Sequence, residues 1–285
     1  MPSPSVGDHP PVDLQLPLVQ VRVDRGAGPC RNTDRCRWYE RQMHEVLVGR
    51  YIARGQPFAG QIAAARIDLR GLSEEEYLAR VRKRYKGNAV RDARNADRAG
   101  LVCRMFTASQ WIGDIVRINH SKDERCGRPM GEAYQRTVRQ MRSDAQQAVE
   151  FQPLDCPCHY DLWWGIFAGP DRGPDASRTD EQLLGYIRLR RNGNYALYAQ
   201  LLGHGDYLRQ GIMYRLHLAI IAWLCQHQAE PTLGLEHLIY AGFRQGGRGL
   251  QLWKKKMCFE PAYLVLAAET PAVSAVGSRP DGEGA

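Results

Sequence analysis

The chain lacks any hydrophobic run long enough to cross a lipid bilayer. Its longest apolar stretch, residues 216–225, contains His217 and is far shorter than the roughly 18–20 residues of a spanning helix. The N-terminus also lacks the basic segment and the long apolar segment of a secretory signal peptide. We therefore expect no membrane span and a cytoplasmic location.

The signatures of dedicated nucleic-acid-binding modules and of metal sites are missing as well. No internal repeat, helix-turn-helix, zinc-finger or RNP pattern is present. Eight cysteines in a chain expected to stay in a reducing compartment predict free thiols rather than disulfides. Residues 156–159 (Cys-Pro-Cys-His), with Cys30 and Cys36, offer enough ligands for zinc, but their spacing differs from the usual two-to-four-residue gaps. This spacing favours structural cysteines, and we expect no metal.

Positive charge, by contrast, is abundant and concentrated. The 285 residues carry 39 Lys and Arg against 31 Asp and Glu, a net charge of +8. The apolar and charged fractions, 44% and 25%, are those of a globular protein with a packed core. Many of the basic residues lie in one segment: Arg80, Arg82, Lys83, Arg84, Lys86, Arg91, Arg94, Arg98 and Arg104. This cationic segment, the Arg80–Arg104 helix, predicts an anionic partner such as tRNA or another polyanion.

Changes in composition along the chain predict four segments. Residues 1–28 contain repeated proline and glycine and predict a flexible N-terminal segment, with one edge strand at 14–23. Residues 29–100 are expected to form an N-terminal extension that ends in the basic helix. Residues 101–268 are expected to form one α+β domain, and residues 269–285 a disordered tail.

Local patterns give the expected elements. Ser73 is an N-cap with Glu76 at N3, and Gly100 is a stop, so we expect one long helix between them, weakened at Gly87. From residue 101 the order is strand, helix, helix, three strands, helix, strand, helix, strand, with a hairpin turn at 191–194. This order predicts a mixed α/β layer, with a central, mostly antiparallel sheet and helices on both faces.

Several segments resemble the GNAT N-acetyltransferase superfamily. They are residues 195–203, HGDYLRQGIMYRLHLAIIAWL at 204–224, and GLQLWKKKMCFEP at 249–261. The basic segment at 77–101 and the Trp253-Lys254 step before Cys258-Phe259 are similar to the Fem-type, or FemAB-like, subgroup. The resemblance covers roughly residues 77–266 and implies a GNAT-like acyltransferase fold.

The resemblance implies that the helix after the fourth strand opens onto the pyrophosphate of acyl-CoA. Independently of it, a glycine at a helix start can expose unpaired backbone N–H groups, and a helix N-terminus attracts anions. The alternative is a glycine that only begins a core helix. We expect the donor to bind at these residues: Leu202, Leu208, Arg209, Gln210, Gly211, Ile212 and Met213.

The resemblance also implies that the reaction takes place at the end of the fourth strand, where a backbone N–H polarises the thioester carbonyl. His204 and Asp206 lie just beyond this strand and are candidates for the base that takes a proton from the attacking amine. Lys254 occupies the place where Fem-like proteins have a lysine that stabilises negative charge. The alternatives are a solvated loop histidine and a solvated lysine face at 254–256.

Three functions are therefore open. The first is an N-acyltransferase that moves an acyl group from acyl-CoA to an acceptor amine. The second is a Fem-like transferase that uses aminoacyl-tRNA as its donor. The third is a non-catalytic protein that binds nucleic acid or another anion on the same fold.

Overall fold

The computed structural model describes residues 13, 15–23, 30–125, 128–147, 155–169, 181–227 and 229–267. The expected tail at 269–285 and most of the expected N-terminal segment lie outside the described residues. A nine-stranded mixed sheet is the centre of the fold, in the order β1-β11-β3-β10-β9-β8-β7-β4, with β2 paired to β11. Its strands are β1 (Leu18–Val21), β2 (Ile52–Ala53), β3 (Ala64–Asp68), β4 (Val102–Phe106), β7 (His159–Ala168), β8 (Gln182–Asn192), β9 (Tyr195–Gly203), β10 (His237–Gly242) and β11 (Glu260–Leu266).

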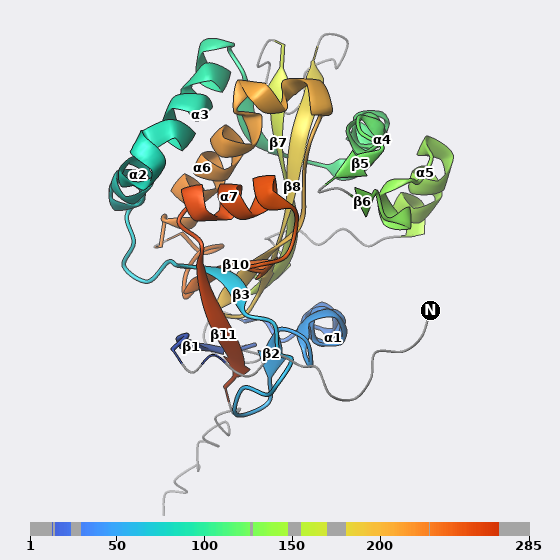
Figure 1. Cartoon of the computed structure of the whole chain (residues 1–285). Helices are drawn as coiled ribbons and strands as arrows, with labels where there is room; N and C mark the ends of the chain where they lie inside the picture. The colour runs from blue at the N-terminus through green and yellow to red at the C-terminus, as the bar shows by residue number, and fades with distance from the viewer. Residues whose placement is uncertain are drawn as a thin grey trace, which may run out of the picture.

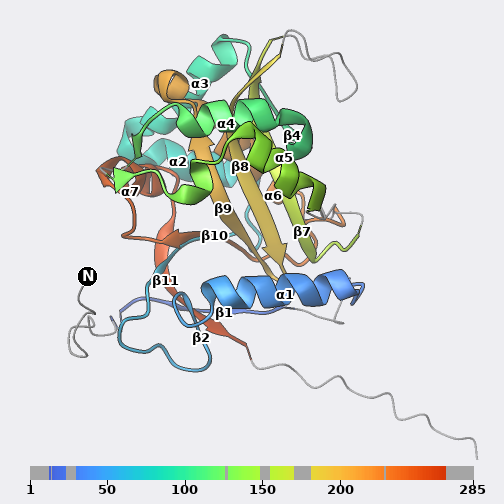
Figure 2. The ribbon, with the colours of Figure 1, turned by 90° about the vertical axis from the view of Figure 1, so that its right-hand side faces the viewer.

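Helices cover both faces of this sheet, as Figure 1 shows. On one side lie α2 (Glu74–Lys83), α3 (Asn88–Arg98), α6 (Ile212–Leu224) and α7 (Arg248–Lys256). On the other lie α4 (Ile112–His120) and α5 (Val138–Gln147), while α1 (Asp34–Leu47) crosses the far ends of the central strands (Figure 2). The expected mixed α/β class is therefore confirmed. The strand pairs are mostly antiparallel, and β9 with β10 is a parallel pair.

The three consecutive antiparallel strands are confirmed as β7, β8 and β9. Residues 191–194 turn between β8 and β9, and Gly193 has φ 66° there, which a glycine adopts at no steric cost. An added Cβ at Gly193 would also collide with the backbone of Arg22 and Val23. The hairpin turn is thus packed against the segment that follows β1. A short two-stranded sheet, β5 (Glu124–Arg125) with β6 (Arg128–Pro129), lies in the connection between α4 and α5.

The prediction of one long helix between Ser73 and Gly100 is wrong in one respect, because this segment forms two helices, α2 and α3. Ser73 caps α2 as expected, its hydroxyl accepting from the Glu76 N–H at 3.1 Å. Tyr85 and Lys86 then have positive φ values of 46° and 56°, so the backbone between the two helices is not helical. The break lets α3 turn and pack its alanine-rich face on α6.

The first hundred residues contribute two strands that the sequence patterns did not predict, β2 and β3, beside the expected edge strand β1. β3 lies between β10 and β11 and is antiparallel to both. β1 forms an edge of the sheet, parallel to β11, at the position expected for an edge strand. The expected boundary at residue 100 therefore does not divide the sheet, which is built from both sides of it.

A chain of buried hydrogen bonds joins the helices to the sheet. His217 on α6 is fully buried, with Tyr198 Oη 2.8 Å from Nδ1 and Tyr77 Oη 2.7 Å from Nε2. Tyr77 donates its hydroxyl proton to the Met257 carbonyl oxygen at 2.7 Å. The Tyr77 oxygen therefore accepts from Nε2–H of His217, and Nδ1 of His217 accepts from the Tyr198 hydroxyl. This arrangement fixes the neutral tautomer of His217 and connects α2, α6, β9 and the end of α7.

Protonation of His217 is expected to destabilise the fold. Burial lowers its pKa from 6.5 to about 3, so between these pH values the unfolded chain binds a proton that the folded chain does not. Stability should therefore fall as the pH falls through this window, by at most about 1.4 kcal/mol per pH unit from this group. Urea unfolding at pH 7, 6 and 5 measures the slope.

The matched variant is His217→Gln, which removes the titrating group. It should be less stable than the parent at pH 7 but lose less stability on acidification. Burial also lowers the pKa of His237, to about 4, and this second contribution is common to both proteins. Equal slopes in the two proteins would contradict a buried, neutral His217.

Candidate functional site

The parallel strands β9 and β10 separate along their length. They pair only where residues 195–197 lie beside residues 237–239. Beyond this point each strand carries a register shift against its other neighbour: β9 between Tyr198 and Gln200, and β10 between Ile239 and Gly242. A bulge bends a strand and increases its local twist, and Ala241 in the β10 irregularity has φ 41°. The two bulges at one level open the sheet.

A cavity of about 770 Å³ lies at this opening, and we call it the β9–β10 cavity. Its walls come from the end of β9, the start of α6, Tyr240 on β10, the first turns of α7 and the connection between α4 and α5. The indole Nε1 of Trp253 is buried in this wall and, within the described chain, finds no hydrogen-bond acceptor. The residues lining the cavity are Lys122, Glu124, Arg125, Met130, Tyr134, Leu201, Leu202, Gly203, Leu208, Met213, Tyr214, Tyr240, Gly247, Arg248, Gly249, Leu250 and Trp253.

The first turn of α7 presents backbone N–H groups to the β9–β10 cavity. Gly247 is its N-cap and makes no side-chain cap, and Gly249 would meet no atom within 4 Å if it carried a Cβ. Arg248 adds a positive charge at the same rim. Since helix N-termini attract anions, this wall is suited to a negatively charged group.

The residues expected to bind a donor divide into two groups. Leu202, Leu208 and Met213 line the β9–β10 cavity. Arg209 and Gln210 are exposed and Ile212 is buried, and none of these three is among the lining residues. Gly211 has φ 77°, and a Cβ there would collide with the backbone carbonyl of Asp92 on α3. The close packing of α3 on α6 therefore explains why position 211 is a glycine.

His204 and Asp206 lie at the end of β9. The His204 side chain caps the turn that follows, Nδ1 accepting from the Asp206 N–H at 3.4 Å. Burial, and next the nearby Arg117, lower the pKa of His204 below 6.5, so the ring is neutral at pH 7. The Asp206 side chain is 85% exposed and 3.8 Å from the ring. Neither residue lines the β9–β10 cavity.

Lys254 is buried, at 1% exposure, so the solvated-face alternative is wrong for this residue. Its ammonium donates to the carbonyl oxygens of Gly242, at 2.6 Å, and Gln245, at 3.0 Å, in the turn after β10. It also lies 5.0 Å from the ring centre of Tyr240, a residue of the cavity wall. Lys254 therefore holds the β10 side of the opening and places a positive charge behind it.

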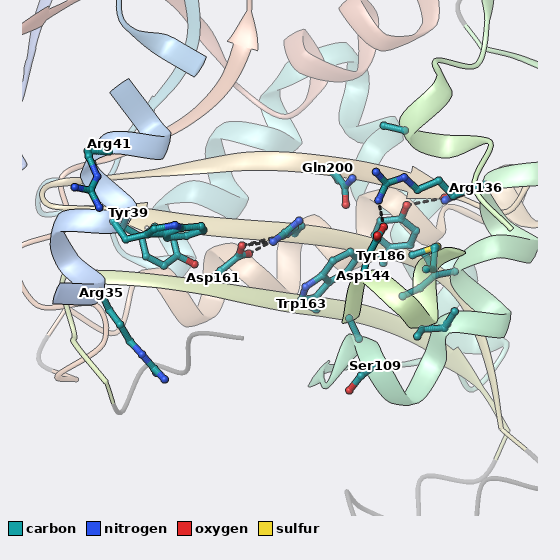
Figure 3. A pocket seen from close by; sticks show the side chains of 18 of the residues that line it. Arg35, Tyr39, Arg41, Ser109, Arg136, Asp144, Asp161, Trp163, Tyr186 and Gln200 are labelled. Carbon is teal, nitrogen blue, oxygen red and sulfur yellow. Dashed lines mark hydrogen bonds and ion pairs between the residues drawn. The ribbon is translucent and has the colours of Figure 1, made fainter. Parts of the chain in front are cut away.

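A second hollow of about 780 Å³ lies on the other face of the sheet, between α1 and α4–α5, and we call it the α1–α4 groove (Figure 3). Asp161 on β7 lies on its floor and accepts from the Arg188 side chain at 2.6–2.9 Å and from Arg190 at 2.9 Å. Burial, and next the Asp161 carboxylate, raise the pKa of Tyr39 on α1. This end of the groove is rich in charge.

The opposite end of the groove combines polar and apolar groups. Tyr186 donates to Asn119 Oδ1 at 2.6 Å, and burial raises the pKa of its hydroxyl, so it remains protonated. Gln200 points into the groove from β9, and its Oε1 is buried with no hydrogen-bond partner among the described residues (Figure 3). Figure 3 also shows the Arg136–Asp144 ion pair at this end.

One strand connects the two hollows. Gln200 lines the α1–α4 groove, and the next residues, Leu201 to Gly203, line the β9–β10 cavity. Arg125 donates to the Gly203 carbonyl at 3.0 Å and to Ser121 Oγ at 3.2 Å, which attaches the α4–α5 connection to this strand end. The two hollows therefore border the same strand at neighbouring residues.

The sequence patterns missed the α1–α4 groove and the α7 side of the cavity. Two signals were present. Glycines 246, 247 and 249 at a helix start are typical of an anion-facing turn, and Asp161, Arg188 and Arg190 are charged residues within otherwise apolar strands. No such sequence signal marked α1 as a wall of the α1–α4 groove, because that role depends on where the helix packs in the fold.

Comparisons with known proteins give structural matches only. No protein-family profile and no curated protein matches the chain. Solved structures that match, each over 70% of this chain, include FemX (9% identity, TM-score 0.48), L-PGS from Bacillus licheniformis (9%, 0.41) and a tandem GNAT protein from the clavulanic acid biosynthesis pathway (16%, 0.38). The matched region spans 59%, 57% and 50% of those chains, respectively, less than two thirds in each case.

Among the described residues, no helix is both long enough and apolar enough to span a membrane.

Proposed function

We propose that the protein is an N-acyltransferase that takes an acyl group from acyl-CoA and transfers it to an amine. The observation that carries this proposal is the opening between β9 and β10, where two bulges expose the edge of a strand to a cavity. The donor would enter the β9–β10 cavity, with its phosphates toward the start of α7 and Arg248. The acceptor amine would come from the α1–α4 groove.

The proposed reaction uses the end of β9. The amine nitrogen attacks the thioester carbonyl and forms a C–N bond, and the C–S bond breaks so that coenzyme A leaves as its thiolate. The proton lost by the amine passes to the base and then to this thiolate. Backbone N–H groups on the unpaired edge of β9 would stabilise the oxyanion, in a place that the cavity partly shields from water. The buried ammonium group of Lys254, which donates to the Gly242 carbonyl, would also stabilise the negative charge of this oxyanion.

Donor binding is tested at Gly249, where a side chain fits. Gly249→Asp places a carboxylate on the cavity wall and should weaken acetyl-CoA binding at least about tenfold, equivalent to about 1.4 kcal/mol. The fold should be unaffected, because acidic residues in the first turn of a helix are favourable. Calorimetry with acetyl-CoA measures the affinity.

Gly249→Ala is the matched control, since its Cβ also meets open space. It should bind the donor within about twofold of the parent chain. Gly211 is unsuitable for this test, because any side chain there disturbs the packing of α3 on α6. A parent chain that does not bind acetyl-CoA at millimolar concentration would contradict the acyl-CoA donor.

The proposed base is His204, with Asp206 as the alternative. A base works only when unprotonated, so turnover should rise with pH through its pKa. Because burial lowers the pKa of His204, the acid limb of the rate profile should lie below pH 6.5, and His204→Ala should remove it. Asp206→Asn is the companion variant, and it should leave that limb in place.

Lys254→Met is expected to lower turnover by about 10²–10³ with little change in donor affinity. Because Lys254 also holds the turn after β10, thermal unfolding of this variant is measured beside its activity. Rates equal to the parent in both His204→Ala and Lys254→Met would remove these residues from the mechanism.

Aminoacyl-tRNA is a second candidate donor, and the surface of α2 and α3 favours it. Six basic side chains of this segment are exposed and make no ion pair with any residue that the structure describes: Arg82, Lys83, Lys86, Arg91, Arg94 and Arg98. The buried residues of α3 point the other way, into the core. The segment thus presents unneutralised positive charge to solvent, as a polyanion-binding surface requires.

Replacing Arg82, Lys83, Lys86 and Arg94 together by Gln tests this surface. The melting temperature should stay nearly unchanged, because exposed charges contribute little to stability. Binding to tRNA, followed by fluorescence anisotropy across a salt series, should weaken and lose most of its salt dependence. If the variant binds tRNA like the parent, the surface is not the docking site.

A further inference from the structure

The structure gathers four potential metal ligands from two distant parts of the chain. Cys30 lies just before α1 and Cys36 in its first turn, whereas Cys156 lies just before β7 and His159 is its first residue. Their ligand atoms all lie within 4.8 Å of one another. Cys36, Cys156 and His159 are buried, and Cys30 is partly buried. The spacing of these residues in the sequence predicted no metal. Their arrangement in space favours a metal site instead.

Four of the six ligand-to-ligand distances within the cluster are close to those of a tetrahedral site, and all six are at most 4.8 Å. Zn–S bonds of about 2.3 Å and Zn–N bonds of about 2.05 Å imply tetrahedron edges of about 3.8 Å between sulfurs and about 3.6 Å between sulfur and nitrogen. Cys30 Sγ lies 3.9 Å from Cys36 Sγ and 4.0 Å from Cys156 Sγ. His159 Nδ1 lies 3.6 Å from Cys30 Sγ and 3.5 Å from Cys156 Sγ. All three cysteines are free thiols.

The orientation of His159 also suits a metal ligand. Its Nε2 lies 3.0 Å from the carbonyl oxygen of Val23. A carbonyl oxygen only accepts, so Nε2 carries the proton and Nδ1 presents its lone pair to the sulfurs. Zinc-binding histidines usually donate their other ring N–H in this way to a carbonyl or carboxylate.

Donors around the sulfurs complete the arrangement. The Asn32 N–H points to Cys30 Sγ at 3.4 Å, within a turn where Asn32 has φ 48°. Thr33 Oγ1 lies 3.3 Å from Cys36 Sγ. Such hydrogen bonds stabilise thiolates, which are the form of cysteine that binds metal.

We propose that Cys30, Cys36, Cys156 and His159 bind one zinc ion. Four protein ligands leave no open position, so the ion would be structural rather than catalytic. It would join α1 to β7 and, through Val23, to the segment after β1. Since Arg35, Trp38 and Tyr39 on α1 line the α1–α4 groove, the ion would also hold one wall of that groove in place.

The metal content of the full-length chain tests this proposal. Protein produced in medium containing zinc and purified without chelator should hold one zinc per chain by elemental mass spectrometry. Cys36→Ser and His159→Ala should each lose most of it. Cys225→Ser, a partly buried cysteine outside the cluster, and Cys158→Ser, a buried neighbour of the four ligands, should keep it.

Cobalt substitution keeps the test decisive if a ligand variant does not fold. The parent chain produced with cobalt(II) should show the visible bands of a tetrahedral ion and thiolate-to-cobalt charge transfer. Chelator treatment of the zinc protein should lower its melting temperature by several degrees. A parent chain without stoichiometric zinc, an octahedral cobalt spectrum, or loss of zinc in Cys158→Ser would overturn the assigned ligand set.

Discussion

The buried hydrogen-bond chain through His217 is the constraint on which the rest of the structure depends. It joins a tyrosine of α2, a tyrosine of β9 and the carbonyl at the end of α7 to one neutral imidazole in the core. An unsatisfied polar group at this depth would be costly, so the helices must keep their places for every donor to find an acceptor. Tyr240 and Trp253, both in the wall of the β9–β10 cavity, pack in the same aromatic cluster. The core thus supports the cavity wall directly.

Two bulges then convert a continuous sheet into a sheet with an opening. β9 keeps its pairing with β8 along its whole length and loses β10 after residue 197, so one edge of a well-anchored strand faces a cavity. The same strand forms part of the groove on the opposite face of the sheet. A rigid strand with a hollow on each side is a suitable place for two ligands to meet, because neither side requires the strand to move.

The proposed zinc site and the proposed reaction are physically connected but independently testable. The four ligands lie at one end of α1, whereas the groove-lining residues lie along it, so losing the ion should loosen the groove without touching the β9–β10 cavity. Donor binding should then survive zinc removal. A failure of the acyl-CoA proposal would leave the argument for the metal unchanged, since it rests on tetrahedral distances and on the tautomer of His159.

The sequence alone determined the elements whose signals are local. These signals depend on neighbours within a few residues. They are the cap at Ser73, the turn at 191–194, the strand-like residue pattern on either side of that turn, and the apolar sequence of helix α6. The expectation that Leu202, Leu208 and Met213 lie at a binding site came from the resemblance instead, and the structure places these three at the β9–β10 cavity. Only the tertiary structure decided where α1 and β3 lie, why position 211 is a glycine, and that four ligands separated by more than a hundred residues form one cluster. These features depend on long-range packing, which spacing along the chain does not encode.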